Sequence, residues 1–150
     1  IAINLSTACH TSGLALPAMQ AANWGRIINI ASVHGLIGSA QKSGYVAAKH
    51  GIVGLTKVTA LENATTGVTA NAICPGWVLT PLVQAQVDAR AEQLGVSIEE
   101  AKRGLLAEKE PSQQFTTPEE LGELAVFLCG PASSNIRGAA WVMDGGWSAQ

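Results

Sequence analysis

The sequence predicts an α/β fold in which a doubly wound parallel sheet of about three strands is flanked by helices. Three observations support this class. Segments of helical character alternate along the chain with short apolar runs rich in β-branched residues. Short apolar runs of this kind suit strands buried in a parallel sheet. Glycine, proline or aspartate follows most of the runs and marks where each strand ends.

The first half of the chain predicts two helices around one strand. Residues 1–23 are small and apolar and indicate a helix, which we expect Pro17 to bend or end. The run 26–32 predicts the first strand, and residues 33–42 predict a loop. A second helix is expected over residues 43–63.

Two glycines lie inside this second helix, where each costs roughly 1 kcal/mol relative to alanine. Gly51 and Gly54 therefore indicate that another element approaches the helix closely. Residues 68–74 predict the second strand, which Pro75-Gly76 ends.

The last part of the chain predicts two or more helices and a final strand. Residues 82–110 have a helical period that breaks near Gly95. The segment 117–120 is a strong helix start, with a threonine cap, a proline at the first helical position and a glutamate three residues after the cap. Residues 139–143 predict the third strand, which residues 144–146 close.

Composition excludes several classes of protein. The chain of 150 residues fits one domain over residues 1–150, with 47% hydrophobic and 13% charged residues. A net charge of −2 with scattered signs argues against a nucleic-acid surface. No apolar run reaches the roughly 20 residues that span a membrane. The three cysteines lie far apart and form no metal-binding pair, so we expect reduced thiols, a cytoplasmic location and no metal.

Three segments fall at the carboxyl ends of the predicted strands. They are Ser32, Pro75-Gly76 and residues 144–146. Open parallel sheets bind ligands at this edge. The sequence therefore places a candidate site there.

The only tyrosine, Tyr45, stands four residues before Lys49, so both share one face of the second predicted helix. Such a pair also occurs on many half-exposed helix faces without any function. A free phenol has a pKa of about 10, and a neighbouring ammonium favours its ionised form. Lys49 would then tune Tyr45 as a proton donor and acceptor, while the Ser32 hydroxyl would hold a substrate oxygen.

This set of groups suits proton transfer to oxygen while another species takes hydride from carbon. No side chain carries hydride, so a nicotinamide cofactor is expected. Gly76 has no side chain and would let the backbone approach a flat ring closely.

The combination of Ser32, a Tyr45-x-x-x-Lys49 motif thirteen residues later and a strand ending in Pro75-Gly76 resembles the short-chain dehydrogenase/reductase family. The resemblance covers the whole chain and implies a Rossmann-like fold and an NAD-dependent oxidoreductase. It also implies that Asn4 is a fourth catalytic residue beside Ser32, Tyr45 and Lys49. In the family this residue fixes a helix kink and a water that relays protons to the lysine. The cofactor also contacts the tyrosine and the lysine.

Longer stretches around these motifs are similar to family members that interconvert (R)-3-hydroxybutyrate and acetoacetate. The similarity implies that four residues surround this small-molecule substrate: His34, Lys42, Gln86 and Trp147. It implies further cofactor contacts by Pro75, Gly76, Val78, Thr80 and Leu82. Each residue also has an ordinary structural interpretation, such as a loop histidine, a solvated charge, an exposed glutamine or a packed tryptophan.

The glycine-rich turn that holds the dinucleotide in this family has no counterpart in the sequence. We therefore expect the chain to be the C-terminal part of the enzyme and to bind NAD poorly by itself. The resemblance implies a homotetramer for the complete enzyme. Two alternatives stay open: another activity of the family, such as 3-oxoacyl reduction or sugar oxidation, and a non-catalytic assembly module. The residues present do not decide between NAD and NADP.

Overall fold

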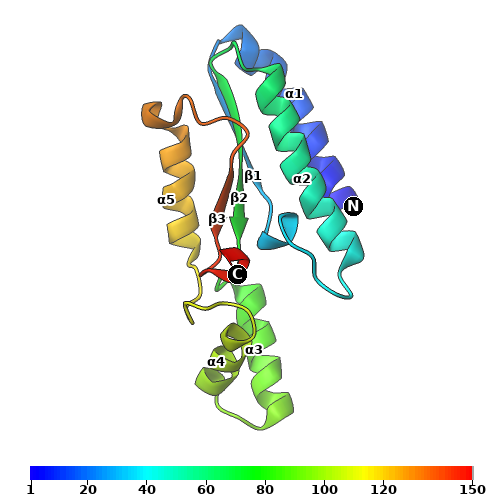
Figure 1. Ribbon diagram of the computed structural model, residues 1–150, viewed down its shortest axis with the longest axis vertical. Helices are drawn as coiled ribbons and strands as arrows, with labels where there is room; N and C mark the ends of the chain where they lie inside the picture. Colours follow the sequence, from blue (N-terminus) through cyan, green and yellow to red (C-terminus); the bar gives the residue numbers. More distant parts are fainter. Residues whose placement is uncertain (150) are drawn as a thin grey trace.

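The computed structural model describes residues 1–149 of the chain and contains a three-stranded parallel sheet with flanking helices (Figure 1). The strands are β1 (Gly25–Ile30), β2 (Val68–Pro75) and β3 (Ala140–Met143), in the spatial order β1-β2-β3. The helices are α1 (Thr7–Ala21), α2 (Ser43–Glu62), α3 (Pro81–Leu94), α4 (Ile98–Ala107) and α5 (Pro118–Cys129). The predicted fold class and all three predicted strands are confirmed.

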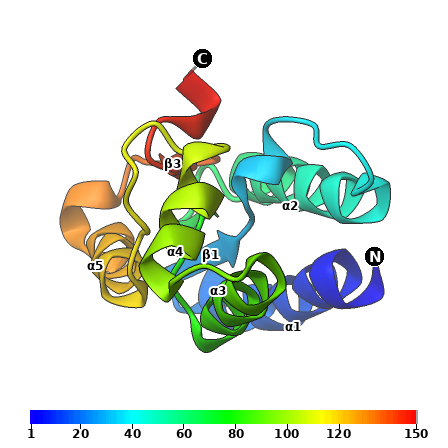
Figure 2. The ribbon, with the colours of Figure 1, turned by 90° about the horizontal axis from the view of Figure 1, so that it is seen from below.

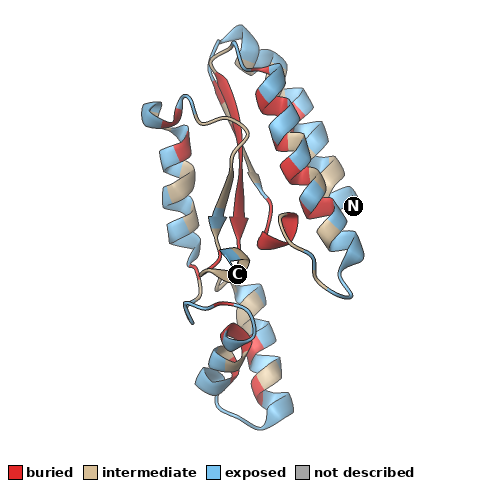
Figure 3. Ribbon diagram, viewed as in Figure 1, coloured by how far each residue is buried: buried red, intermediate tan, exposed pale blue. Residues whose placement is uncertain are grey.

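The sheet is the middle layer of the molecule. Helices α1 and α2 lie along one face, and α5 covers the other (Figures 1 and 2). Helices α3 and α4 project beyond the carboxyl ends of the strands (Figure 1). All eight residues of β2 are buried, and Figure 3 shows the buried residues concentrated in this strand and in the side of α2 that faces it. Burial on both faces is typical of a central strand in a parallel sheet that helices cover on each side.

The register of the sheet brings the strand ends to one edge. Ile30 pairs with Ile73, and Pro75 pairs with Met143. The segments that follow the strands therefore begin at nearly the same level. This arrangement confirms that Ser32, Gly76 and Asp144 meet at one edge of the sheet.

The expectation for Pro17 is wrong in part, because the proline lies inside α1 and the helix continues to Ala21. A proline inside a helix removes one backbone hydrogen bond, but the turns on either side remain. Leu16 and Met19 flank Pro17 and pack on the cluster that contains Ile27 of β1. This packing holds the helix together across the proline.

The two glycines of α2 differ in their surroundings. A Cβ atom on Gly51 would lie 2.7 Å from Leu5 Cδ2, so the close approach that the sequence predicts occurs there. A Cβ atom on Gly54 would meet nothing within 4 Å. Leu5 belongs to η1 (Ala2–Ser6), a short π-helical segment that precedes α1 and packs on α2.

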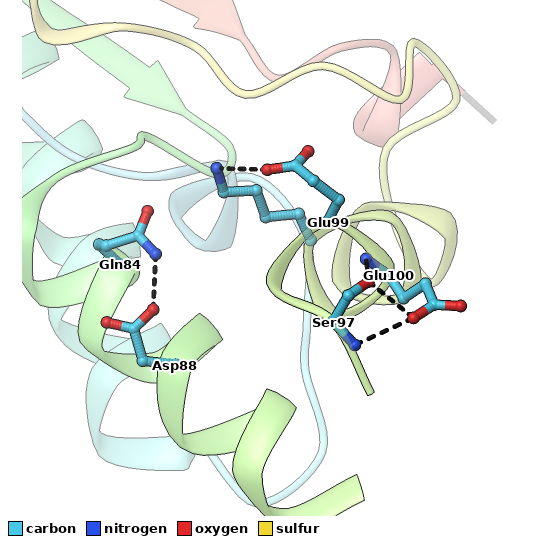
Figure 4. Close-up of polar contacts among 6 residues, drawn as sticks. Gln84, Asp88, Ser97, Glu99 and Glu100 are labelled. Atoms are coloured by element: carbon cyan, nitrogen blue, oxygen red, sulfur yellow. Dashed lines mark hydrogen bonds and ion pairs between the residues drawn. The ribbon is translucent and has the colours of Figure 1, made fainter. Parts of the chain in front are cut away.

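Helices α3 and α4 form a small lobe with its own core, made by Val87, Ala91, Ala101 and Leu105. Helix α4 begins with a capping box, in which Ser97 and Glu100 each bond the other's backbone N–H (Figure 4). Side-chain contacts on the lobe's surface include Gln84 Nε2 to Asp88 at 2.7 Å within α3 (Figure 4) and an ion pair between Arg90 and Glu108 at 2.7 Å.

The predicted helix start at Thr117 is confirmed by a second capping box, with Glu120, at the start of α5. Among residues 1–149, no helix is long and apolar enough to cross a membrane.

Candidate active site

A cleft of about 370 Å³ lies at the edge of the sheet where the strands end. Most of the residues that the sequence singles out line it: Ser32, His34, Lys42, Tyr45, Lys49, Pro75, Gly76, Val78, Thr80, Gln86 and Trp147. They come from the segments after β1, β2 and β3 and from the facing turns of α2 and α3. The volume suits a small molecule together with part of a larger one.

Ser32 lies two residues beyond β1 and begins the short helical turn Val33–Gly35. Its Oγ accepts a hydrogen bond from the backbone N–H of His34 at 3.1 Å. This bond fixes the hydroxyl at the rim of the cleft, because the side chain acts as the cap of the turn.

Tyr45 and Lys49 lie one turn apart on α2, as the spacing predicts. The Lys49 Nζ is 5.6 Å from the centre of the Tyr45 ring. It donates a hydrogen bond to the carbonyl oxygen of Ile30 at 3.0 Å, which ties α2 to the end of β1. Lys49 is only 8% exposed, whereas Tyr45 is 40% exposed. The phenol is therefore accessible from the cleft, while the ammonium lies beneath it.

Burial lowers the pKa of Lys49 below its ordinary value of 10.5, with a smaller opposing effect from Cys74. Burial also raises the pKa of the Cys74 thiol, which lies in β2. The amine and the thiol thus occupy an apolar layer under the cleft. In such a layer a charge acts on its neighbours more strongly than it would in water.

His34 is the centre of an aromatic group in the cleft. Its ring contacts Tyr45 edge-to-face at 5.9 Å and Trp147 at 5.2 Å. Its Nδ1 lies 3.5 Å from Ser32 Oγ, while its Nε2 is buried without a hydrogen-bond partner among residues 1–149. An unpaired buried nitrogen that faces no protein acceptor is suited to a ligand.

Burial lowers the pKa of His34 below 6.5, and the positive charges of Lys42 and Lys109 lower it further. Both effects favour the neutral form of the imidazole. An anion bound beside Lys42 would oppose both effects and favour the charged ring.

Helix α3 brings a second wall to the cleft. Thr80 caps the helix, with its Oγ1 accepting from the Val83 N–H at 3.3 Å. The cap fixes the start of α3, so that Thr80, Val83 and Gln86 face the cleft together. The spacing of three residues places them on one side of the helix.

The loop after β2 explains why residue 76 is a glycine. A Cβ atom there would overlap Glu110 Oε1 and lie 2.9 Å from the Asp144 Cα. The backbone N–H of Trp77 donates a hydrogen bond to that same Glu110 oxygen. The sequence predicts that Gly76 is small because a flat ring approaches it, but the crowding that the structure places at Gly76 comes from Glu110 and Asp144.

Two predicted residues lie outside the cleft. Leu82 is 72% exposed and does not line the cleft. It lies in the first turn of α3 between the cleft residues Thr80 and Val83, on a different side of the helix. Asn4 is half-buried and lines an adjacent hollow of about 270 Å³, together with Lys49. Lys49 is therefore common to both spaces.

Three residues that the sequence did not single out belong to this region. Trp77 and Val83 line the cleft, and their positions just after Pro75-Gly76 and at the start of α3 were the available signals. Glu110 supports the loop after β2 from behind, although it lies 33 residues from its partner Trp77. No local pattern marks such a contact.

Comparison with known proteins agrees with this architecture. A family model of the short-chain dehydrogenases, described as enoyl-(acyl carrier protein) reductase, matches residues 1–148. A D-beta-hydroxybutyrate dehydrogenase of Cupriavidus necator is 70% identical over the whole chain, and one of Rhizobium meliloti is 51% identical. The chain spans 58% of the length of each of these two relatives.

A solved structure of similar fold is that of an actinorhodin polyketide ketoreductase variant with NADPH. Its TM-score is 0.87 at 36% identity, over 98% of this chain and 57% of the other. The family model, the relatives and the parallel sheet with its cleft all lead to one assignment. The chain belongs to the short-chain dehydrogenase/reductase family.

Proposed function

We propose that the whole protein interconverts (R)-3-hydroxybutyrate and acetoacetate with NAD(H). Two relatives named D-beta-hydroxybutyrate dehydrogenase support this proposal through their identity with the chain. The observation that carries it is a single cleft that combines Tyr45 and Lys49 with two groups able to bind a carboxylate, His34 and Lys42.

The carboxylate of the substrate would lie between Lys42 and His34. The ammonium of Lys42 supplies a charge, and the buried Nε2 of His34 supplies a nitrogen without a protein partner among residues 1–149. Hydrogen bonds to charged groups are roughly twice as strong as those between neutral groups. Gln86 would donate from the α3 side, and Trp147 would pack on the methyl end of the acid.

The proton of the C3 hydroxyl would pass to Tyr45 while Ser32 holds the same oxygen. In the direction of oxidation, the O–H bond breaks, the C3–H electron pair leaves as hydride, and a C=O double bond forms. The positive charge of Lys49 favours the phenolate that accepts this proton. Asn4, on the other side of Lys49, would anchor the relay that carries the proton onward.

When bound, the nicotinamide would supply the hydride acceptor that no side chain provides. The residues present fit such a group, because Pro75, Gly76, Val78 and Thr80 line the same cleft as Tyr45 and Lys49. Lys49 donates one of its three N–H groups to the carbonyl oxygen of Ile30, so two remain that could donate to ribose hydroxyls. A contact from Leu82 stays a prediction.

The proposal includes three further points: the enzyme works in the cytoplasm, it takes part in ketone-body metabolism, and it assembles as a homotetramer. Supporting observations are large exposed apolar side chains on the helical layer, including Leu14, Val58 and Leu61. The three cysteines are all free thiols, as a reducing compartment requires.

The proposal is tested by comparing acetoacetate with a neutral methyl ketone such as butanone as substrates of the whole protein. Lys42→Ala and His34→Ala should each raise KM for acetoacetate by roughly tenfold or more, because a hydrogen bond to the charged carboxylate is lost. KM for the neutral ketone should change much less. Lys57→Ala, which removes a lysine outside the cleft, is the matched control. Equal losses for both substrates would exclude a carboxylate site.

A second candidate is the reduction of 3-oxoacyl thioesters. The polyketide ketoreductase of similar fold favours it. Turnover of long acyl thioesters without turnover of acetoacetate would establish this candidate in place of the first.

A further inference from the structure

Glu110 is a buried carboxyl group that the proposed reaction does not use. It follows α4, is 1% exposed, and forms no ion pair with any residue among 1–149. Its Oε1 accepts the Trp77 N–H, and its Oε2 is buried without a hydrogen-bond partner. An uncompensated carboxyl at such depth is rare because it is costly to ionise.

Two glycines make room for this carboxyl group. A Cβ atom on Gly76, after β2, would overlap Glu110 Oε1. A Cβ atom on Gly145, after β3, would lie 3.2 Å from Glu110 Oε2. Glu110 Oε1 therefore lies against the loop after β2 and Oε2 against the loop after β3. The Glu110 carboxyl group is packed between these two loops.

Both of these loops carry walls of the cleft. Trp77 follows Gly76 directly, and Trp147 stands two residues after Gly145 and packs on His34. Neighbours of Glu110 strengthen the connection, since the Ser112 N–H donates to the Gly145 carbonyl oxygen at 2.9 Å. A movement of Glu110 would thus be transmitted to two tryptophans of the cleft.

We propose that Glu110 is a positioning residue that sets the distance between the two tryptophan walls of the cleft, and that its protonation state changes this distance. The proposal deepens the proposed function, on which its consequence for turnover rests. Its structural part concerns the cleft alone.

The charged groups around Glu110 decide the direction of the change. Asp144 faces it from the β3 loop, and the oxygens of Asp144 are taken by the Gly146 N–H and by the N–H and hydroxyl of Ser148. Lys109 precedes Glu110, but its Nζ lies over the Trp147 ring at 6.0 Å. Burial raises the pKa of Glu110 to about 7, the Trp77 N–H opposes this, and the charge of Asp144 adds to it.

Ionisation of Glu110 would strengthen its hydrogen bond with Trp77 and place a second negative charge beside Asp144. The loop after β2 is then held more tightly while the loop after β3 is repelled, so the walls separate. A proton on Glu110 reverses both effects. The cleft should therefore hold a small acid best below pH 7.

The test follows the Trp77 backbone amide by ¹⁵N–¹H NMR from about pH 5 to about pH 9, two units on either side of the pKa of about 7. We expect the amide signal to titrate with a midpoint near 7, and Glu110→Gln to abolish this titration while keeping an acceptor for the N–H. Glu108→Gln removes an exposed carboxylate that pairs with Arg90, and it should leave the titration unchanged. Burial lowers the pKa of His34, and any titration that comes from this residue should persist in Glu110→Gln, so the comparison of the two proteins identifies the contribution of Glu110.

A Trp77 signal that stays flat in the parent protein, or that still titrates in Glu110→Gln, would overturn the proposal. Selective ¹³C labelling of glutamate carboxyls reads the Glu110 titration directly, without any variant that must fold. In the whole protein, KM for acetoacetate should rise by about threefold or more as the pH increases through 7. This rise should exceed the one seen in Glu110→Gln, and kcat should change less than KM. If acetoacetate is not turned over but Trp77 titrates through Glu110, the proposed function fails and this inference stands.

Discussion

Lys49 is held in a place that is unfavourable for a charge. It is 8% exposed, and burial lowers its pKa, which means that the folded protein holds the lysine proton less tightly than the unfolded chain does. At neutral pH this charge therefore reduces the stability of the fold. A buried cation that costs stability and lies beneath an exposed phenol indicates a functional role.

The variant Lys49→Met separates these two effects. Methionine has similar length without charge, and the carbonyl that loses its partner belongs to Ile30, a residue that is 51% exposed at the end of β1. We expect the free energy of unfolding to stay within about 1 kcal/mol or to increase, while turnover falls by roughly a hundredfold or more. Chemical denaturation and steady-state kinetics measure the two quantities, with Lys57→Met as the control. A loss of several kcal/mol would show that Lys49 is mainly structural.

The individual residues of the cleft could be predicted from the sequence because they lie at short, regular spacings. Tyr45 and Lys49 share a helix face, and Ser32 ends a strand. Leu82 and Glu110 mark the limit. The side of α3 that faces the cleft depends on where Thr80 caps the helix, and the contact of Glu110 with Trp77 depends on packing between distant segments.

The junction between α1 and β1 is closed by a contact with a glycine in the turn before β2. A Cβ atom on Gly67 would overlap the Asn23 carbonyl oxygen and lie 2.7 Å from the Asn23 carbonyl carbon. The Gly67 backbone is also held in place by a hydrogen bond, because its N–H donates to Asn23 Oδ1 at 2.8 Å. Backbone atoms cannot move aside as a flexible side chain can.

We therefore expect Gly67→Ala to reduce the free energy of unfolding by about 2 kcal/mol. Gly54→Ala is the matched control, since its Cβ atom would meet nothing within 4 Å and α2 gains helix propensity. Urea denaturation of both variants measures the difference. If the two substitutions had the same effect, the closeness of this junction would be refuted.

Elements were predicted well where local chemistry decides them. The cap at Thr117 has its proline and glutamate in sequence, and the structure starts α5 there. The capping box of Ser97 and Glu100 also has a capping residue and a glutamate three positions later, but no proline follows the cap, and the prediction gave only a break near Gly95. The prediction that Pro17 could end the helix was wrong, because the packing of α1 on the sheet outweighs the loss of one backbone hydrogen bond.

The whole molecule should respond to pH through its buried acid. The pKa of Glu110 is about 7 when folded and 4.5 ordinarily, so the folded state binds its proton more tightly. The stability that this group contributes is complete below about pH 4.5 and is lost as pH rises through about 7. His34 acts in the opposite direction, because its lowered pKa makes stability fall as pH drops below 6.5.

Urea denaturation between about pH 5 and about pH 8 should reveal this loss, on the order of 2 to 3 kcal/mol. In Glu110→Gln the decline should be much smaller, since the amide does not ionise. Glu108→Gln should retain the full decline. Parallel curves for the parent protein and Glu110→Gln would mean that Glu110 is already ionised at low pH.

At the scale of the molecule, the parallel order of the strands and the site at their carboxyl ends were predictable, because the two follow from the same connectivity. The apolar surfaces left on α1, α2 and α5 were not assigned a partner by pattern alone. Exposed residues such as Leu14, Leu61 and Val126 have the same hydrophobic character as core residues, and only the packing distinguishes them.

The most direct test of the account is the rate of NAD-dependent oxidation of (R)-3-hydroxybutyrate by the whole protein carrying Tyr45→Phe. Loss of the hydroxyl alone should reduce kcat by roughly a hundred- to ten-thousandfold, while thermal stability and acetoacetate binding stay near those of the parent. A variant that keeps a substantial share of the parent rate would contradict proton transfer by Tyr45, and with it the function proposed for the cleft.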